Sequence, residues 1–93
     1  GKQNPYDHSI RMPFLISGPG VPKGKRVREL IYMQSVYPTT CELAGLNIPE
    51  SVDFPSLKNL ALGKKESGEK LIYGCYQDIQ RLVRSKTHKL IFY

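Results

Sequence analysis

The side chains that could take part in chemistry are few and widely spaced along the 93 residues. Near the start, Lys2 follows Gly1, and His8 and Arg11 come soon after. By residue type alone, Lys2 is ordinary surface charge. A single imidazole such as His8, without a partner ligand, is more often a structural hydrogen-bonding residue than a site residue. Arg11 is explained equally well by lining a cleft or by an ion pair with Asp7, so these residues alone define no active site.

The two cysteines form no recognisable redox or zinc motif. Cys41 and Cys75 lie far apart in the sequence, with no Cys-x-x-Cys spacing and no neighbouring pair of histidines. Both are predicted to be small buried apolar residues, and a disulfide between them requires their backbones to lie close together. Tyr76, Gln77 and Arg81 fall near a predicted strand end, where they either contact a sugar or belong to a packed or solvated edge.

The charge of the chain favours anionic partners, because fourteen Lys and Arg against eight Asp and Glu give a formal charge of +6. The basic residues lack the aromatic pattern and the Cys and His spacing of a nucleic-acid module, so no nucleic-acid partner is predicted. No apolar stretch approaches the roughly twenty residues that cross a bilayer, so no membrane span is predicted. The basic clusters are solvated surface charge or, in the alternative, a polyanion-binding surface: Lys23/Lys25/Arg26/Arg28, Lys64/Lys65 and Arg81/Arg84/Lys86/Lys89.

The first two thirds of the chain favour short helices and loops around one small core. After an irregular start at residues 1–12, the apolar run 13–17 predicts a buried strand that ends in a turn at 18–20. Ser35 is a candidate cap for a helix that holds a proline in its first turn and stops at Gly45. Residues 56–63 repeat the same design in a shorter helix.

The last third of the chain is rich in β-branched and aromatic residues, which favour strands. Three runs, 71–73, 81–84 and 89–93, predict a three-stranded meander. The four residues 85–88 are short enough for a hairpin connection, although they lack the Asn-Gly or Asp-Gly pair typical of one.

Several short motifs occur in an order that resembles the sulfatase family. Each motif is common by itself, but together they cover nearly the whole chain at the family's spacing. At five positions the chain departs from the family: Asp7 replaces the usual Glu, His8-Ser9 the Gly-Gly of many arylsulfatases, Ser35 an Asp and Phe54 a Gly. These departures leave the substrate subfamily open. The matching motifs are Gly1-Lys2, Tyr6-Asp7, Arg11-Met12-Pro13, Gly18-Pro19-Gly20, Pro38-Thr39, Leu43-Ala44-Gly45, Ser56-Leu57, Arg81-Leu82-Val83 and Lys89-Leu90-Ile91.

The resemblance implies a fold. Sulfatases are α/β enzymes of the alkaline phosphatase superfamily whose smaller C-terminal domain holds a four-stranded antiparallel sheet and a packed helix. This chain is therefore expected to be α+β, with a small antiparallel sheet of about four strands and one or two packed helices. Residues 1–20 would end an active-site loop of the catalytic domain and form the strand after it, and residues 21–93 would be the C-terminal subdomain.

The resemblance also implies a chemistry. Sulfatases hydrolyse sulfate esters with a formylglycine, made from the Cys or Ser of a Cys/Ser-x-Pro-x-Arg motif, beside a bound calcium ion. Neither Cys41 nor Cys75 is followed by that pattern, so the formylglycine and the calcium ligands are expected outside this chain. Lys2 matches the family's lysine that contacts a sulfate oxygen, where an ammonium would stabilise developing negative charge. His8 is expected at the pocket mouth as a second substrate-binding residue.

These observations predict a fragment of a sulfuric ester hydrolase that, at full length, acts on a sulfated saccharide or a small aryl sulfate. The fragment alone is expected to be inactive. Because the chain shows neither an initiator methionine nor a signal peptide, we expect the remainder of the catalytic domain to precede it, in a secreted, periplasmic or lysosomal protein. The alternative is a non-enzymatic polyanion-binding domain.

Overall fold

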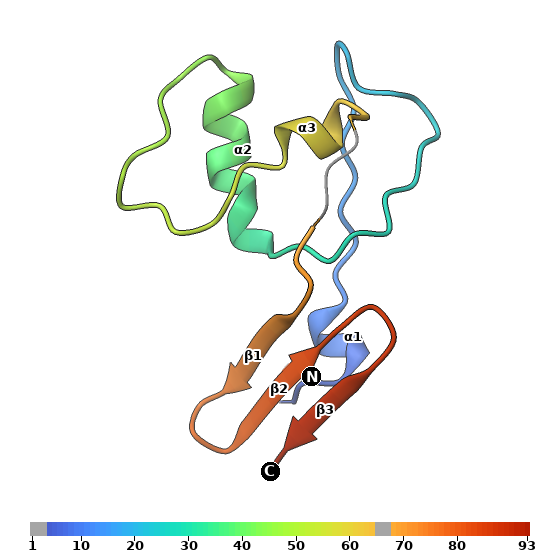
Figure 1. The fold of residues 1–93 in the computed structure, drawn as a ribbon, viewed down its shortest axis with the longest axis vertical. Helices are drawn as coiled ribbons and strands as arrows, with labels where there is room; N and C mark the ends of the chain where they lie inside the picture. The colour runs from blue at the N-terminus through green and yellow to red at the C-terminus, as the bar shows by residue number, and fades with distance from the viewer. Residues whose placement is uncertain (1–3, 65–67) are drawn as a thin grey trace. The chain divides into compact units, whose positions relative to one another are not determined.

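The computed structural model describes residues 4–64 and 68–93, which fall into two compact units (Figure 1). One, which we call the sheet unit, combines residues 4–15 with residues 69–93. The other, the helical unit, comprises residues 16–64 and 68. The described elements are short helices and one small antiparallel sheet, so the predicted α+β class is confirmed. The expected division of the chain at residue 20 stays a prediction.

The sheet unit is built on an antiparallel meander of β1 (Ile72–Tyr76), β2 (Gln80–Arg84) and β3 (Lys89–Phe92). Gly74 of β1 and Ile91 of β3 both pair with Leu82 at the centre of β2. Leu82 is only 3% exposed, because alternation along the strand turns its side chain toward the covered face of the sheet. The predicted meander is therefore confirmed, and the absence of a side chain at Gly74 leaves room for the leucine.

Both hairpin connections are stabilised by side chains. Between β1 and β2, Gln77 has a positive φ of 50°, and the Arg81 guanidinium donates to the carbonyl oxygens of Gln77 (2.9 Å) and Gln80 (3.2 Å). Between β2 and β3, the Ser85 hydroxyl oxygen accepts hydrogen bonds from the backbone N–H groups of Thr87 (3.3 Å) and His88 (3.1 Å). A serine turn thus takes the place of the Asn-Gly pair, and the predicted hairpin is confirmed.

A one-turn helix, α1 (Asp7–Ile10), lies where the sequence predicts irregular chain, so that prediction is wrong for these four residues. The Asn4 side-chain oxygen accepts hydrogen bonds from the backbone N–H of Tyr6 (3.1 Å) and from the hydroxyl of Ser9 (3.2 Å), which folds the chain back on itself. A single turn is too short to show helical periodicity in sequence.

The helical unit contains the predicted helix as α2 (Val36–Leu43), preceded by a 3-10 turn, η1 (Met33–Ser35). Gly45 ends it in the left-handed conformation, with φ of 75° and its N–H bonded to the Glu42 carbonyl oxygen. Ser35 is buried and makes no side-chain cap, so its predicted capping role is wrong. The 3-10 turn is already wound ahead of the helix and takes over the function of a cap.

The second predicted helix is present as α3 (Lys58–Ala61). The Ser56 hydroxyl oxygen accepts a hydrogen bond from the backbone N–H of Lys58 at the start, and Gly63, with φ of 82°, follows the end. The Thr39 hydroxyl on α2 accepts a hydrogen bond from the N–H of Leu57 at 2.7 Å and donates to the Ser35 carbonyl oxygen. These contacts join the two helices, and the small core beside them includes Cys41 and Leu57.

Two expectations are corrected. Residues 13–17 are exposed and belong to no strand, and the sheet in the described part of the chain has three strands rather than about four. An apolar run becomes a strand only when a second strand lies beside it, and residues 13–17 have no such neighbour within the described ranges. The turn at Gly18-Pro19-Gly20 is confirmed by the hydrogen bond from the Val21 N–H to the Gly18 carbonyl oxygen. No helix within 4–64 and 68–93 has the length and apolar character to cross a membrane.

Candidate functional site

The site residues predicted from sequence are Lys2 and His8, and His8 belongs to the sheet unit. Lys2 lies outside the described residues, so the structure does not place it. His8 lies on α1 and is exposed, and its ring stacks on Tyr6 with centroids 6.3 Å apart. Its substrate-binding role stays a prediction. The site can therefore be built only from α1 and the strands that hold it.

Asp7 fixes α1 to the sheet. Its carboxylate oxygen Oδ1 accepts hydrogen bonds from Arg84 on β2 (2.8 Å) and from Lys89 on β3 (2.7 Å). Arg84 and Lys89 are directly paired in the sheet register, so their side chains leave the same face and converge on one carboxylate. The Arg84 and Lys89 side chains are each 23% exposed, which limits their screening by solvent. Asp7 thus pairs with these two residues and not with Arg11, the partner considered from sequence.

The two cations change the acidity of Asp7. The hydrogen bond from the Lys89 ammonium has the largest effect and, aided by the charge of Arg84, holds the pKa of Asp7 below its ordinary value of 3.8. Partial burial opposes this shift without reversing it. Asp7 is therefore ionised at neutral pH and acts as an anchor for α1, because its carboxylate accepts hydrogen bonds from Arg84 and Lys89 on the sheet.

A second contact ties the same segment to the far end of the sheet. The hydroxyl groups of Tyr6 and Tyr93 form a hydrogen bond, and this bond raises the pKa of Tyr93 above its ordinary value. Tyr6 thus bonds to Tyr93, and its neighbour Asp7 bonds to one residue on each of β2 and β3. His8, the next residue, is held on the outside of a fixed turn.

A shallow hollow of about 130 Å³ lies between the α1 segment and the sheet. It is smaller than the roughly 300 Å³ or more of a typical ligand pocket, so by itself it cannot enclose a sugar. Two polar side chains, Asn4 and Ser9, form part of it and bond to each other. Its lining comes from Asn4, Pro5, Ser9, Ile10, Gly74, Cys75, Tyr76 and Leu82.

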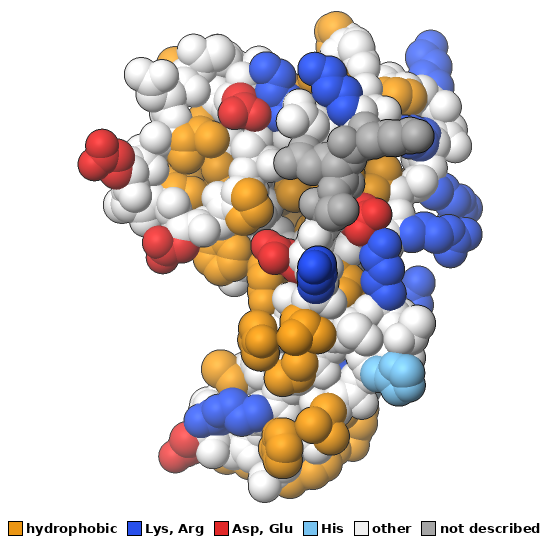
Figure 2. All heavy atoms as spheres, viewed as in Figure 1, with side chains coloured by type: hydrophobic (Ala, Val, Ile, Leu, Met, Phe, Trp, Pro, Cys, Tyr) orange, Lys and Arg blue, Asp and Glu red, His pale blue; other side chains and the backbone are white. Residues whose placement is uncertain are grey.

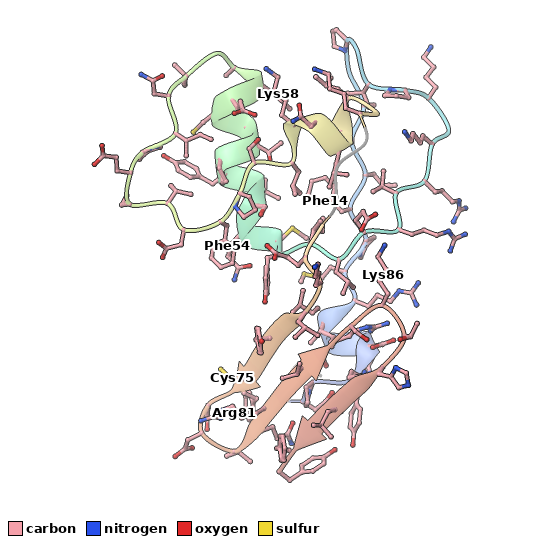
Figure 3. The ribbon with its side chains drawn as sticks, in the orientation of Figure 1. Phe14, Phe54, Lys58, Cys75, Arg81 and Lys86 are labelled. Atoms are coloured by element: carbon pink, nitrogen blue, oxygen red, sulfur yellow. The ribbon has the colours of Figure 1, made fainter. Side chains whose placement is uncertain are left out.

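The other residues considered from sequence are the two cysteines and three residues at or beside the β1–β2 turn. Cys41 is buried and Cys75 is exposed, and both are free thiols, so the expectation that both are buried is wrong for Cys75. Strand alternation turns Cys75 away from the face that Leu82 occupies, and Cys75 lies opposite Arg81 in the register (Figure 3). Arg81 supports the β1–β2 turn, and Gln77 provides that turn's positive φ. Tyr76 is half-buried at the hollow.

The residues of this site do not fit a metal centre. Among residues 4–64 and 68–93, no three or more His, Cys, Asp or Glu side chains are grouped to hold a metal ion. Asp7, the carboxylate next to His8 in the sequence, is engaged by two cations. Sequence reasoning missed the clamp of Asp7, Arg84 and Lys89, because no local pattern links residues 77 and 82 positions apart. Their opposite charges were the only signal available.

Comparison with known proteins defines the class of the chain. The family model for the C-terminal part of N-sulphoglucosamine sulphohydrolase matches residues 1–93 in full. The chain therefore belongs to the sulfatases, in the family described by that C-terminal domain. The resemblance inferred from the ordered motifs is confirmed. No solved structure matches the chain significantly.

Individual relatives are also named as sulfatases. The chain is 33% identical over 91 residues to a putative extracellular sulfatase Sulf-1 homolog of Caenorhabditis elegans, across 97% of this chain and 13% of that protein. It is 30% identical over 96 residues to an arylsulfatase of Clostridium perfringens, across 96% of this chain and 20% of that protein. Human arylsulfatase K is 32% identical over 60 residues, across 64% and 11%. The chain thus spans a small part of the length of these relatives.

Proposed function

We propose that this chain is the C-terminal part of a sulfuric ester hydrolase that, at full length, cleaves sulfate esters of carbohydrates or aryl compounds. The observation that carries the proposal is the match of a sulfatase C-terminal family model to residues 1–93. Relatives named extracellular sulfatase and arylsulfatase support it. The isolated chain is inactive under this proposal, because the groups that perform the chemistry lie in the remainder of the protein.

Under this proposal, the start of the chain contributes to substrate binding. Lys2 would contact a sulfate oxygen, where negative charge grows as the ester bond breaks and a fixed ammonium stabilises it better than bulk water does. His8 would line the mouth of the pocket. The support from the structure concerns His8: its neighbour Asp7 is anchored by Arg84 and Lys89, which fixes α1 on the sheet.

Calcium and formylglycine would be supplied by other segments of the full protein. The described residues do not form a cation site, and neither cysteine begins a Cys-x-Pro-x-Arg sequence. Within this chain, the proposed contributions are therefore a positive charge at Lys2, a polar contact at His8 and the ion pairs of Asp7 that fix α1, which carries His8. None of these groups needs to exchange a proton with the substrate.

The test is Lys2→Ala in the full-length protein, assayed on a small aryl sulfate. We expect kcat/KM to fall about a hundredfold or more, equivalent to about 3 kcal/mol of transition-state stabilisation, with little change in thermal stability. Lys2→Arg retains the charge but places it on a planar guanidinium, so partial activity is expected. The matched control is Lys70→Ala, which removes an exposed lysine of the sheet unit and should leave turnover unchanged. Near-normal turnover in a folded Lys2→Ala protein would contradict the assignment.

A further inference from the structure

A stretch of the helical unit concentrates positive charge. Residues 22–28, which we call the basic loop, contain four cationic side chains and no acidic one, and all seven residues are exposed. Figure 2 shows blue Lys and Arg side chains gathered along the edge where Figure 1 draws this part of the chain. Ordinary protein surfaces mix both signs of charge at this scale, so the basic loop is a local source of positive potential. Its cations are Lys23, Lys25, Arg26 and Arg28.

The basic loop is held in place by the turn after α3. The Lys25 ammonium donates a hydrogen bond to the Gly63 carbonyl oxygen at 3.2 Å. Pro22 packs so closely on Gly63 that a Cβ at this glycine would lie 2.7 Å from the proline ring. The next residue, Lys64, is exposed and adds a fifth cation beside the loop. Two segments that are separate in sequence thus form one basic surface.

In the described part of the chain, no carboxylate forms an ion pair with this surface. Within the described ranges, the ion pairs join Asp7 to Arg84 and Lys89, and none involves a cation of the basic loop. Glu29, the acidic residue that follows the loop directly, accepts a hydrogen bond from the Gly68 N–H at 3.3 Å. The cationic side chains therefore remain available for an anionic ligand.

The arrangement of the charges favours a polymer over a small anion. The four cations come from six successive residues, which extend over at most about 20 Å, and they do not come from several elements converging on one point. A chain molecule with repeated negative charges can engage several of them together. The loop contains no aromatic side chain on which a base could stack and no helix to enter a groove, so nucleic acid is the poorer fit.

We propose that the basic loop, with Lys64, is a binding surface for a sulfated polysaccharide. The choice of polymer rests on the proposed function, because a hydrolase of sulfate esters meets such chains as substrates. The surface would retain the polymer while individual esters are presented to the catalytic centre. Small aryl sulfates, which carry one charge, would not depend on it.

The test uses the full-length protein and compares Arg26→Ala/Arg28→Ala with the control pair Lys70→Ala/Lys86→Ala, which removes the same charge from exposed positions of the sheet unit. Heparin is the probe. We expect the loop pair to weaken heparin binding about tenfold at physiological salt and to reduce the salt dependence of binding, because fewer counterions are released. The control pair should bind heparin nearly as the wild type does. Both should retain kcat/KM for a small aryl sulfate.

Three outcomes would overturn the inference. The first is an unchanged heparin affinity in the loop pair, and the second is an equal loss in the control pair, which would show that only net charge matters. The third is that single-stranded DNA of matched charge binds the wild type as tightly as heparin does, and that the loop pair weakens DNA binding as much as heparin binding. Turnover of the aryl sulfate by the wild type reports the proposed function separately. If the wild type did not turn over the aryl sulfate, the proposed hydrolase function would be rejected. The heparin measurements would still test the basic loop.

Discussion

The two units of the chain reach order by different physical means. The sheet unit joins residues from both ends of the sequence, as the bond between Asp7 and Lys89 shows across 82 positions. The helical unit is continuous in sequence, and its buried hydrogen bond between Thr39 and Leu57 spans only 18 positions. The sheet unit combines a buried leucine with charged partners at its surface, whereas the helical unit relies on buried neutral hydrogen bonds.

This difference matters for the proposed site. His8 lies on α1, and the position of α1 on the sheet is decided by charges on β2 and β3. The basic loop belongs to the other unit and is held by a backbone carbonyl and by packing on glycine. Conditions that weaken ion pairs should therefore affect the α1 segment before they affect the helical unit.

The largest expected effect is in the sheet unit, at Leu82. Leu82→Ala leaves a cavity at the centre of the three strands, so we expect the free energy of unfolding to fall by about 3 kcal/mol. Denaturant unfolding of the full-length protein, followed by hydrogen exchange of the strand amides, measures it. Leu90→Ala is the control, because Leu90 is 55% exposed and should cost less than about 1 kcal/mol. Equal effects at the two leucines would show that Leu82 is not a core residue.

The helical unit should respond most to loss of the Thr39 hydroxyl. Thr39→Val keeps the shape of the side chain but leaves the Leu57 N–H without its acceptor, at a cost of about 2 kcal/mol. The matched control is Thr40→Val on the next residue of α2, whose hydroxyl is exposed and bonds only the Val36 carbonyl oxygen. Thermal unfolding of both variants provides the comparison. If Thr40→Val were the more damaging change, the proposed hydrogen-bonded link would be wrong.

The smallest effect is expected at Asp7, and it should depend on pH. Asp7→Asn removes the ion pairs with Arg84 and Lys89, and we expect a loss of about 1 kcal/mol or less at neutral pH, since the carboxylate is partly exposed. The pKa of Asp7 is lowered by folding, so the unfolded state binds more protons in mild acid. The stabilisation is complete above the unfolded pKa of about 4 and is lost as the pH falls through the folded pKa.

The measurement is the unfolding free energy of wild type and Asp7→Asn between pH 7 and pH 3. The two curves should converge as the pH falls. Asp53→Asn is the control, because Asp53 is exposed and has no ion pair within the described ranges. A difference that persists unchanged at pH 3 would mean that Asp7 stabilises the sheet unit through something other than its charge.

Much of the local structure could be predicted from sequence. The strands β1 to β3 follow from runs of β-branched and aromatic residues, and α2 follows from a proline near its start and Gly45 at its end. The predictions failed where a local pattern needed a partner: residues 13–17 have the composition of a strand but no neighbouring strand in the described ranges. Cys75 was expected to be buried, but its exposure depends on which face of the sheet the neighbouring elements cover.

The order of the motifs by itself determined the family of this chain, because residue types and spacing are properties of the sequence and need no coordinates. Composition likewise determined the net positive charge, and the order of the residues determined where the basic loop lies in the sequence. Only the tertiary structure decided that Asp7 meets Arg84 and Lys89, and that Pro22 and Lys25 meet Gly63. The physical reason is that opposite charges and close packing are compatible with many pairings, and the chain fold alone selects which groups come within reach of one another.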